Sequence, residues 1–471
     1  MTSYSLFRQN VQQNQTTCEL AVEYYLQSIE QRSDLNAFLT VNTDDARQSA
    51  KEADVRFKDD TPRPLEGMVV AIKDNISTKG LTTTCGSKML QNFKPVYNAT
   101  VIERIRNAGG IIIGKTNCDE FAMGSSNENS AYGNVLHPIN NEYVPGGSSG
   151  GSAVAVAGGL AHTSLGSDTG GSIRQPAAFC GIIGFKPTYG RISRYGLVAF
   201  ASSLDQIGPF ANSIEDTALL LDTMSGHDPL DSTTANLPPT QSFYALHHHD
   251  DNVTVGVLPD EMLEGCNEDV ISAYHNCIQK LRTSGYSITT VEIPGKSAWI
   301  PTYYILATAE ASANLSRFDG IRYGFRGPEN EGMDVFTSTR SLGFGPEVKR
   351  RIMLGTYVLS SGYYDAYYKK GQQARRLVHN GYKEIFAACD VLFLPTTPST
   401  AFKFGEKSKD PVSMYLSDLY TVSANLAGIP AISIPVGNGA NSMPLGMQLQ
   451  AAEFEDEKLL RIAKHTMDLF A

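Results

Sequence analysis

The sequence predicts an α/β fold with a buried sheet that is largely parallel or mixed. Short apolar runs bounded by turns, such as GMVVAI at residues 67–72 and VLFLP at residues 391–395, alternate with stretches of helical periodicity. Such runs are typical of strands buried on both faces, and their alternation with helices is typical of α/β layers. The chain of 471 residues is also long enough to enclose a sizeable core.

Local signals place the elements of the first half. The run Thr16-Thr17-Cys18-Glu19 has the form of a capping box, and it opens an amphipathic helix that continues to about Arg32. A second helix is expected over residues 44–57. The pair Gly109-Gly110 ends a further helix. The remaining elements expected here are strands at residues 67–72, 111–113 and 160–165 and a short helix at residues 152–157.

The second half follows a polar connector that carries Pro238-Pro239. A strand at residues 253–257, a helix at 267–284 and a strand at 287–293 predict a βαβ unit. Residues from about 300 to 385 are rich in tyrosine and helical in pattern, and residues 391–395 return to a strand.

We expect one domain over residues 1–471, since there is no internal repeat or low-complexity segment. Its parts are a helical N-terminal segment (about 1–60), a core with the catalytic motifs (about 61–224), the connector (about 225–252), an elaboration for substrate specificity (about 253–390) and a return to the core (391–471).

Composition excludes several classes of protein. A net charge of −10 disfavours a broad nucleic-acid footprint. No apolar run approaches the roughly 18 residues that span a bilayer, and the N-terminus lacks the regions of a signal peptide, so we expect a cytoplasmic protein that does not act at a membrane.

Cysteine and histidine usage predicts no metal site. The seven cysteines are scattered without a CxxC pair, which favours reduced and mostly buried thiols. The cluster His247-His248-His249 lies in a polar stretch, where a solvated loop is expected.

One nucleotide-binding motif is a chance match. Residues 109–116, GGIIIGKT, fit the pattern GxxxxGK[ST], but a P-loop needs its variable positions in a flexible turn. Three isoleucines at those positions favour a strand. We therefore expect no phosphate binding there.

Two glycine–serine turns carry the clearest chemical signal. Residues 146–152 read GGSSGGS and residues 167–172 read SDTGGS, and a short apolar span separates them. Glycine permits close approach of a ligand to the backbone, and serine supplies a hydroxyl that can act as a nucleophile. Ser172 is the best candidate nucleophile, although a turn of this kind is more often only a turn. The backbone N–H groups of Thr169, Gly170 and Gly171, with that of Ser172, could converge on a developing oxyanion.

A serine nucleophile needs a base. His137 precedes a proline in a loop and His162 lies in an apolar span, so neither is a good candidate. Lys73 follows the buried strand at 67–72, where desolvation would favour its neutral and basic form. By itself, Lys73 would more often be a solvated lysine at the end of a strand.

Lys73 in VVAIKDN, Ser148 in GGSSGGSA and Ser172 in GSDTGGSIRQPA occur in that order, with 24 residues between the two serines. In this the chain resembles the amidase signature family over nearly its whole length. The resemblance implies a large mixed central sheet covered by helices on both faces. It also implies a Ser–cis-Ser–Lys triad in which Ser172 forms the acyl-enzyme, Ser148 relays protons and Lys73 is the general base.

Asp168 and Arg174 are charged residues inside the same motif. Lone buried charges are costly and pairing lessens the cost, so we expect these two to support each other structurally.

Segments of the second half resemble one branch of the family, the glutaminase subunits of tRNA-dependent amidotransferases. These are SRFDGIRYG at 316–324, VKRRI at 348–352 and SSGYYD at 360–365. The resemblance implies that Arg351 and Asp418 hold the α-carboxylate and α-ammonium of glutamine and that Tyr303 lines the same pocket. Without it, both charged residues would be taken for a solvated helix face.

The resemblance also implies the reaction and the partners. The chain would hydrolyse glutamine, without a cofactor of its own, and pass ammonia to a tRNA-binding and ATP-binding B subunit that uses Mg²⁺. A small C subunit would complete the complex. The sequence leaves open whether Glu-tRNA(Gln), Asp-tRNA(Asn) or both are served. Two alternatives remain, a stand-alone amidase for a small carboxamide and a non-catalytic scaffold.

Overall fold

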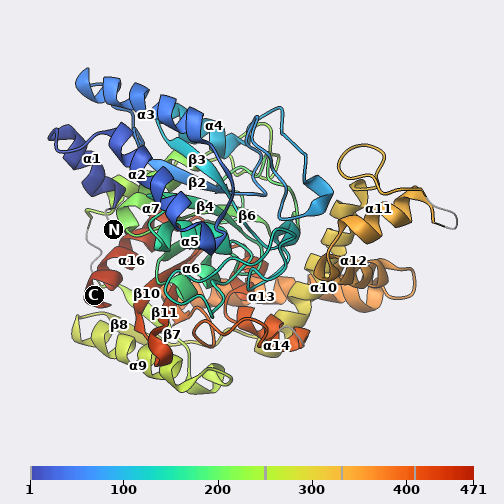
Figure 1. Cartoon of the computed structure of the whole chain (residues 1–471). Coiled ribbons are helices and arrows are strands. Elements are labelled where there is room, and N and C mark those ends of the chain that lie inside the picture. Colours follow the sequence, from blue (N-terminus) through green and yellow to red (C-terminus); the bar gives the residue numbers. More distant parts are fainter. Residues whose placement is uncertain (1–2, 249–251, 330–332, 408–409, 471) are drawn as a thin grey trace.

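The computed structural model describes residues 3–248, 252–329, 333–407 and 410–470 (Figure 1). Its strands are β1 (Phe38–Val41), β2 (Val69–Lys73), β3 (Ile111–Thr116), β4 (Thr163–Asp168), β5 (Ile183–Lys186), β6 (Gln206–Ala211), β7 (Thr254–Val257), β8 (Ser287–Thr290), β9 (Val391–Pro395), β10 (Ala431–Asn438) and β11 (Pro444–Ala451).

Across these ranges the strands form an 11-stranded sheet in the order β1-β3-β2-β4-β6-β5-β10-β11-β9-β7-β8. The sheet is mixed: β2 runs parallel to β3 and β4, β7 runs parallel to β8 and β9, and β10 and β11 are antiparallel. This confirms the α/β prediction. Strands from every predicted part of the chain except the connector join this one sheet, which supports the prediction of a single domain. The bounds of the parts stay a prediction.

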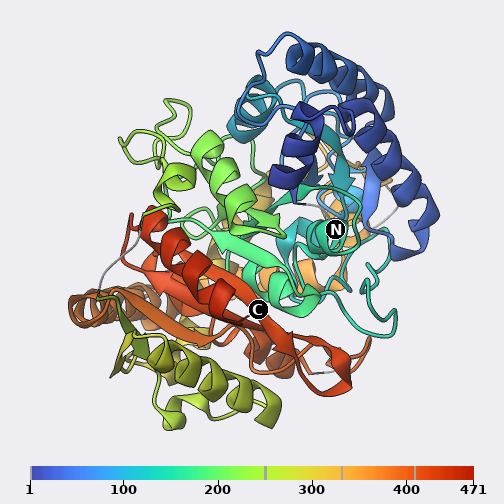
Figure 2. The ribbon, with the colours of Figure 1, turned by 90° about the vertical axis from the view of Figure 1, so that its left-hand side faces the viewer.

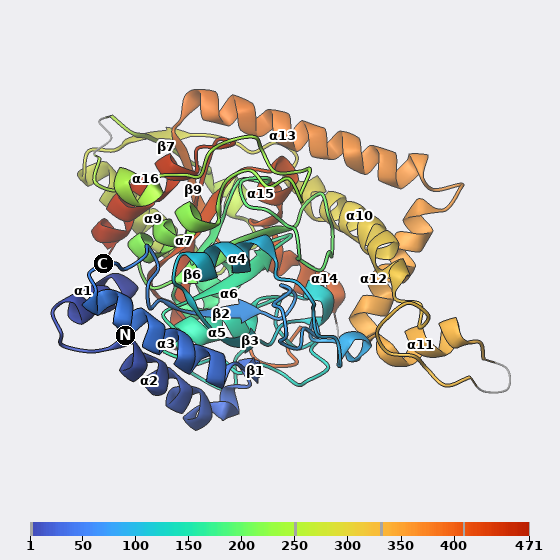
Figure 3. The ribbon, with the colours of Figure 1, turned by 90° about the horizontal axis from the view of Figure 1, so that it is seen from above.

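Helices lie on both sides of the sheet (Figure 2). They are α1 (Tyr4–Gln12), α2 (Cys18–Gln31), α3 (Thr43–Lys58), α4 (Thr100–Asn107), α5 (Gly150–Ala157), α6 (Arg174–Cys180), α7 (Ile214–Met224), α8 (Ser242–Ala245), α9 (Glu268–Thr283), α10 (Lys296–Asn314), α11 (Val335–Gly343), α12 (Pro346–Leu359), α13 (Lys370–Ala388), α14 (Pro411–Tyr415), α15 (Val422–Ala427) and α16 (Asp456–Phe470). Helices α11 and α12 extend to one side of the sheet, next to α10 (Figures 1 and 3).

Several predicted boundaries are displaced, among them the strand expected at 287–293, which is β8 and ends at Thr290. The N-cap of α2 is Thr17, whose hydroxyl accepts from the Leu20 N–H, so the expected capping box of Thr16 and Glu19 does not form and the helix begins one residue later. Two other backbone N–H groups of the first turn, those of Cys18 and Glu19, donate to the carboxylate of Asp54 in α3. The strand expected at 160–165 is β4 instead, because residues 158–161 still complete the turn after α5.

The sheet brings the ends of β2 and β4 together. These strands are parallel, with Ile72 opposite Leu165, and both are buried along their whole length. Lys73, the last residue of β2, and Asp168, the last of β4, therefore lie at the same edge of the sheet. This edge is where ligand sites form in open α/β sheets.

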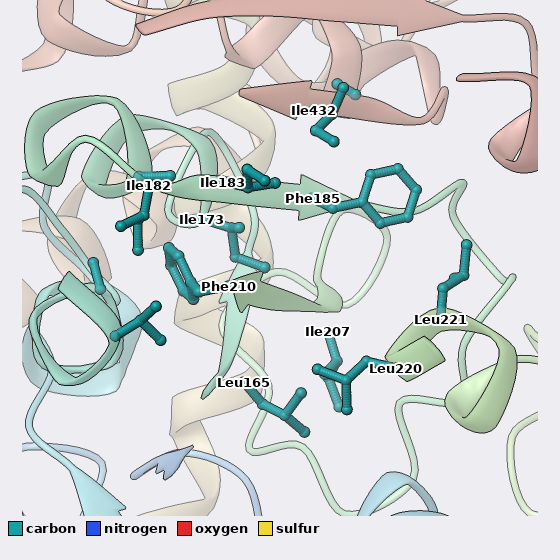
Figure 4. Packing of buried hydrophobic residues seen from close by; sticks show 14 of the residues in the cluster. Leu165, Ile173, Ile182, Ile183, Phe185, Ile207, Phe210, Leu220, Leu221 and Ile432 are labelled. Atoms are coloured by element: carbon teal, nitrogen blue, oxygen red, sulfur yellow. The ribbon is translucent and has the colours of Figure 1, made fainter. Parts of the chain in front are cut away.

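Ile173 fixes the position of Ser172. Its side chain is fully buried in the core beside Leu165, Phe185 and Phe210 (Figure 4). Glycines on three strands leave room for it: a Cβ added at Gly166, Gly184 or Gly208 would lie 3.0–3.1 Å from an Ile173 side-chain atom. The core thus holds the turn that carries Ser172.

None of the helices in the described ranges is both long and apolar enough to cross a bilayer. All seven cysteines are free thiols, and six of them are buried, as the sequence predicted.

Candidate active site

Lys73 lies at the centre of a buried hydroxyl cluster. Its Nζ is 2.7 Å from Ser148 Oγ, 2.8 Å from Ser149 Oγ and 3.0 Å from Ser167 Oγ. The side chain is fully buried, and burial lowers its pKa to about 8, although the nearby carboxylate of Asp119 acts in the opposite direction. A lysine in this setting is neutral in an appreciable fraction of molecules near neutral pH.

The hydrogen bonds around Lys73 orient its nitrogen. The Ser149 hydroxyl donates to the Ser167 carbonyl (3.2 Å), so Ser149 Oγ is free to accept from Lys73. Ser167 Oγ also accepts from the Asn75 amide at 2.9 Å. A neutral amine has two N–H groups and one lone pair. With its two N–H groups directed to Ser149 and Ser167, the lone pair points at Ser148.

Ser148 follows a cis peptide bond from Gly147. Only a glycine fits there, because a Cβ at Gly147 would lie 2.1 Å from Asp119 Oδ2. The Gly147 N–H donates to Gln175 of α6 at 3.0 Å, and the Ser148 carbonyl accepts from the Asp119 N–H at 3.1 Å. These contacts tie the first glycine–serine turn to the helix that follows the second.

Ser172 follows Ser167 by five residues in the second glycine–serine turn, and 9% of its surface is exposed. Its hydroxyl makes no hydrogen bond within the part of the chain that the structure describes. Of the two motif serines, Ser148 is fully buried and Ser172 is partly exposed, so Ser172 is the one that is open to a substrate.

The predicted oxyanion donors differ in their surroundings. The Gly171 N–H already donates to Asp168 Oδ1 at 2.8 Å. The Tyr303 ring covers Gly170 so closely that a Cβ there would lie 2.4 Å from it. The Gly170 carbonyl accepts from the Thr421 hydroxyl at 2.6 Å, which fixes the orientation of the adjoining peptide. The amides of Thr169 and Gly170 are the better candidates, since that of Gly171 has an acceptor.

Asp168 and Arg174 form the pair that the sequence predicted. Arg174 Nε and Nη2 each lie 3.0 Å from a carboxylate oxygen of Asp168, and both residues are fully buried. Burial acts to raise the pKa of Asp168, but the charge and hydrogen bonds of Arg174 outweigh it and lower that pKa to about 2. Arg174 also donates to Thr421, Asn425 and Gln448.

Arg351 of α12 lies in an aromatic cage. Its guanidinium carbon is 5.2, 5.5 and 5.8 Å from the ring centroids of Tyr304, Phe200 and Tyr415. Its Nε donates to Glu347 Oε1 at 2.8 Å, one helical turn earlier. Because Glu347 holds the Nε edge, the two terminal nitrogens remain to meet a carboxylate.

Asp418 is buried near this guanidinium. Its Oδ2 accepts from the Ser125 hydroxyl at 2.6 Å. Burial raises the pKa of Asp418 to about 7, although Ser125 and the charge of Arg351 oppose the shift. The charges of Arg351 and Asp418 both act on the pKa of the Tyr303 phenol, the first lowering it and the second raising it.

A cavity of about 190 Å³ opens beside Arg351, and Asp418, Tyr303 and Ser172 are not among the residues that line it. Its lining includes Gly124, Ser126, Glu347, Arg351 and Tyr415.

Four residues of the site were missed by the sequence analysis. Ser167 belongs to the second glycine–serine turn and Ser149 follows Ser148 directly, so both lay within recognised motifs. Glu347 precedes Arg351 by four residues, a spacing that predicts an ion pair on a helix. Ser125 had no signal in the sequence, because its contact with Asp418 spans 293 residues.

The alternative sites do not form. Residues 111–116 of the P-loop match are the buried strand β3, and Lys115 donates to the Ile76 carbonyl and the Thr83 hydroxyl. His137 contacts the Phe179 carbonyl, and His162 is buried among aromatic rings. The described residues contain no group of three or more His, Cys, Asp or Glu side chains that could hold a metal. Of the histidine cluster, His249 lies outside the described residues.

A mixed α/β sheet has a buried lysine beside a cis-peptide serine at one edge, and the second glycine–serine turn lies at the same edge. With the family match that follows, this fold defines a class of amide hydrolases. The chain belongs to the Amidase family, whose model matches residues 20–460.

Close relatives are amidotransferase subunits. The chain is 52% identical over 446 residues to the A subunit of glutamyl-tRNA(Gln) amidotransferase from Bacillus cytotoxicus, covering 94% of this chain and 92% of the relative. The crystal structure of the protein of the same name from Thermotoga maritima matches with a TM-score of 0.76 at 39% identity, covering 95% of this chain and 90% of that one. Peptide amidase from Stenotrophomonas maltophilia matches with a TM-score of 0.82 at 27% identity, covering 100% and 97%.

Proposed function

We propose that the chain is the glutamine-hydrolysing subunit of a tRNA-dependent amidotransferase. One observation carries the proposal: the charges of two buried residues, Arg351 and Asp418, both act on Tyr303, whose ring packs against Gly170 in the turn that carries Ser172. A guanidinium suits a carboxylate, and a carboxylate suits an ammonium. Their pairing beside a nucleophile suits a zwitterionic amino acid with an amide side chain. The names of closely similar relatives, which are A subunits of glutamyl-tRNA(Gln) amidotransferase, support the assignment to such an amidotransferase.

The reaction begins with proton transfer. Neutral Lys73 takes a proton from Ser148, and Ser148 takes one from Ser172, whose oxygen attacks the side-chain amide carbon of glutamine. The amides of Thr169 and Gly170 stabilise the oxyanion of the tetrahedral intermediate. The protons return along the same serines to the leaving nitrogen, and ammonia departs. Water then attacks the ester by the same relay, and glutamate is released.

The remaining assignments concern the complex. Ammonia passes to a B subunit that binds tRNA and uses ATP and Mg²⁺ to convert Glu-tRNA(Gln) to Gln-tRNA(Gln). A small C subunit stabilises the assembly of the other two. The chain itself needs no cofactor, and its place is the cytoplasm. The proposal does not depend on whether Asp-tRNA(Asn) is also a substrate.

The test is ammonia release from glutamine by the chain co-expressed with the B and C subunits, with and without ATP, Mg²⁺ and Glu-tRNA(Gln). Ser172→Ala is the blank. We expect release that requires Ser172 and rises when the tRNA substrate and ATP are added. Cleavage of simple carboxamides without glutamine hydrolysis would instead establish a stand-alone amidase.

A further inference from the structure

Asp205 is a buried carboxylate that contacts the turn carrying Ser172. It directly precedes β6 and is 2% exposed. Strands β4 and β6 are antiparallel, with Asp168 opposite Gln206. The next residues beyond this pair, Thr169 and Asp205, therefore lie opposite each other. The proposed reaction gives Asp205 no role.

Three donors hold the Asp205 carboxylate. Its Oδ1 accepts from the Thr169 hydroxyl at 2.6 Å and from the Ala201 N–H at 3.1 Å, and its Oδ2 accepts from the Phe200 N–H at 3.0 Å. A buried carboxylate needs such donors in place of the water that it has lost. Burial raises the pKa of Asp205 to about 6, although the hydrogen bonds from Thr169 and Ala201 lower it, so the group is ionised at about pH 8.

The shortest of these bonds reaches the candidate oxyanion hole. Thr169 and Gly170 supply the two amides assigned to it, and the Gly170 carbonyl accepts from the Thr421 hydroxyl at 2.6 Å. Asp205 holds Thr169 in turn, through its side chain. Hydrogen bonds at both residues thus restrain the peptide that joins them. An oxyanion donor is effective when it is oriented before the charge develops.

Phe200 offers Asp205 a second route to the site. The Phe200 ring belongs to the aromatic cage of Arg351, with its centroid 5.5 Å from the guanidinium carbon. Asp205 contacts only the backbone N–H of Phe200, however, and the Phe200 carbonyl has its own support from the Asn314 amide at 3.1 Å. Phe200 therefore depends less on Asp205 than Thr169 does.

We propose that Asp205 is a positioning residue for the oxyanion hole, and that it acts through the hydroxyl of Thr169. The inference rests on the proposed function only in requiring that Ser172 attacks an amide. Because the oxyanion forms on every amide that is cleaved, the contribution of Asp205 does not depend on which substrate is bound.

The test removes each end of the hydrogen bond. Asp205→Ala removes the acceptor, and Thr169→Val removes the hydroxyl but keeps the backbone amide and the size of the side chain. Thr169→Ser keeps the hydroxyl. These variants and the double variant Asp205→Ala/Thr169→Val are co-expressed with the B and C subunits. We measure kcat and KM at pH 8 for glutamine and for 4-aminobutanamide, an amide that lacks the carboxylate.

Asp216 of α7 provides the matched control. It is fully buried and, like Asp205, accepts from two backbone N–H groups and one hydroxyl, which belong to Tyr4 and Ser5 of α1. Asp216→Ala therefore removes a similar set of bonds away from the candidate active site. Thermal unfolding of both variants compares their losses of stability.

We expect Asp205→Ala to lower kcat about tenfold or more for both amides, with smaller changes in KM. Thr169→Val should lose a similar factor, and the double variant no more than about threefold beyond Asp205→Ala, because both substitutions break the same bond. Thr169→Ser should stay within about threefold of the wild type, and Asp216→Ala within about twofold.

Three results would overturn the inference. If Asp216→Ala lowers kcat as much as Asp205→Ala at a similar loss of stability, Asp205 is only structural. If the losses in the two single variants multiply in the double variant, Thr169 is not the route. If Asp205→Ala impairs the hydrolysis of glutamine but not of 4-aminobutanamide, the effect passes through Phe200 to Arg351.

Failure of the proposed function has a different outcome. If the wild-type complex cleaves 4-aminobutanamide but not glutamine, the substrate assignment fails, and kcat for 4-aminobutanamide still decides the role of Asp205. If Asp205→Ala cleaves both amides at the wild-type rate, the role of Asp205 fails while the proposed function stands.

Discussion

The protonation state of Lys73 should control the rate. Because burial lowers its pKa to about 8, the neutral form grows as pH rises and is complete about one to two units above that value. We predict that kcat for glutamine rises with pH and levels off above about pH 9. The measurement is kcat between pH 6 and 10. A kcat that falls across this range would contradict the role of Lys73 as the base, and Lys73→Ala should lower kcat at least about 1000-fold.

Asp418 should set the pH dependence of substrate binding. Its pKa is raised to about 7, and only its ionised form attracts an ammonium, so KM for glutamine should increase as pH falls below 7. The Ser125 hydrogen bond lowers this pKa. Ser125→Ala should therefore move the KM transition to higher pH. If the pH of the KM transition is the same in Ser125→Ala and in the wild type, Asp418 is not the group whose titration controls KM.

Glu347 positions Arg351 without reaching the substrate itself. Glu347→Gln keeps the size of the side chain but removes the charge that holds the Nε edge of Arg351. We predict a KM for glutamine about tenfold higher with kcat changed less than twofold. The control substrate is 4-aminobutanamide, which has the amide and the ammonium but no carboxylate. If the kcat/KM for this substrate falls as much as the kcat/KM for glutamine, Glu347 stabilises helix α12 in general and does not specifically orient Arg351.

At the scale of elements, the N-terminal helices pack over a buried histidine. His162, at the end of the turn before β4, contacts the rings of Tyr4 and Phe7 of α1 and Tyr25 of α2, and its Nδ1 accepts from the Val69 N–H at 3.1 Å. Burial lowers its pKa from 6.5 to about 3. The folded protein thus holds the imidazole neutral, while the unfolded chain protonates it below pH 6.5.

This difference predicts a loss of stability in acid. As pH falls from 6.5 towards 3, His162 should contribute a decrease of about 1.4 kcal/mol per pH unit to the free energy of unfolding. His162→Gln keeps an acceptor for Val69 but cannot titrate. We expect this variant to be less stable at pH 7.5 yet to lose less stability on acidification to pH 4.5, as measured by urea unfolding. Equal losses in the two proteins would contradict the prediction.

At the scale of the whole molecule, the Asp168–Arg174 pair joins the two halves of the chain. Arg174 follows the second glycine–serine turn, whereas its acceptors Thr421, Asn425 and Gln448 belong to the C-terminal return. The pair therefore connects the turn that carries Ser172 to residues that lie about 250 positions further along the chain.

Asp168→Asn leaves the Arg174 charge buried and uncompensated. We predict a loss of about 3–5 kcal/mol in the free energy of unfolding, because removing one partner of a buried pair costs more than the pair contributes. Glu23→Gln is the control, since Glu23 and Arg47 form a surface pair and its loss should matter much less. Denaturant unfolding of the three proteins compares them. A small effect of Asp168→Asn would show that the pair is not structural.

The local features of this protein follow from short stretches of its sequence. The runs at Ile111–Ile113 and Val391–Pro395 are strands, the βαβ unit after the connector forms, and the tyrosine-rich segment is helical, because hydrophobic period and turn residues act over a few positions. The second glycine–serine turn pointed to Ser172 and the end of a buried strand pointed to Lys73, whereas the role of Ser148 came from the family resemblance. The family resemblance, and no local pattern, supplied Arg351 and Asp418.

Which side chains meet depends on the packing of segments that are far apart in the sequence. That β10 and β11 lie between β5 and β9 follows from pairing across hundreds of residues, which no local pattern specifies. The same holds for Ser125 on Asp418 and for Ser149 and Ser167 on Lys73. The pKa values of about 8 for Lys73 and about 7 for Asp418 arise chiefly from burial, and burial exists only once the sheet and its helices have packed.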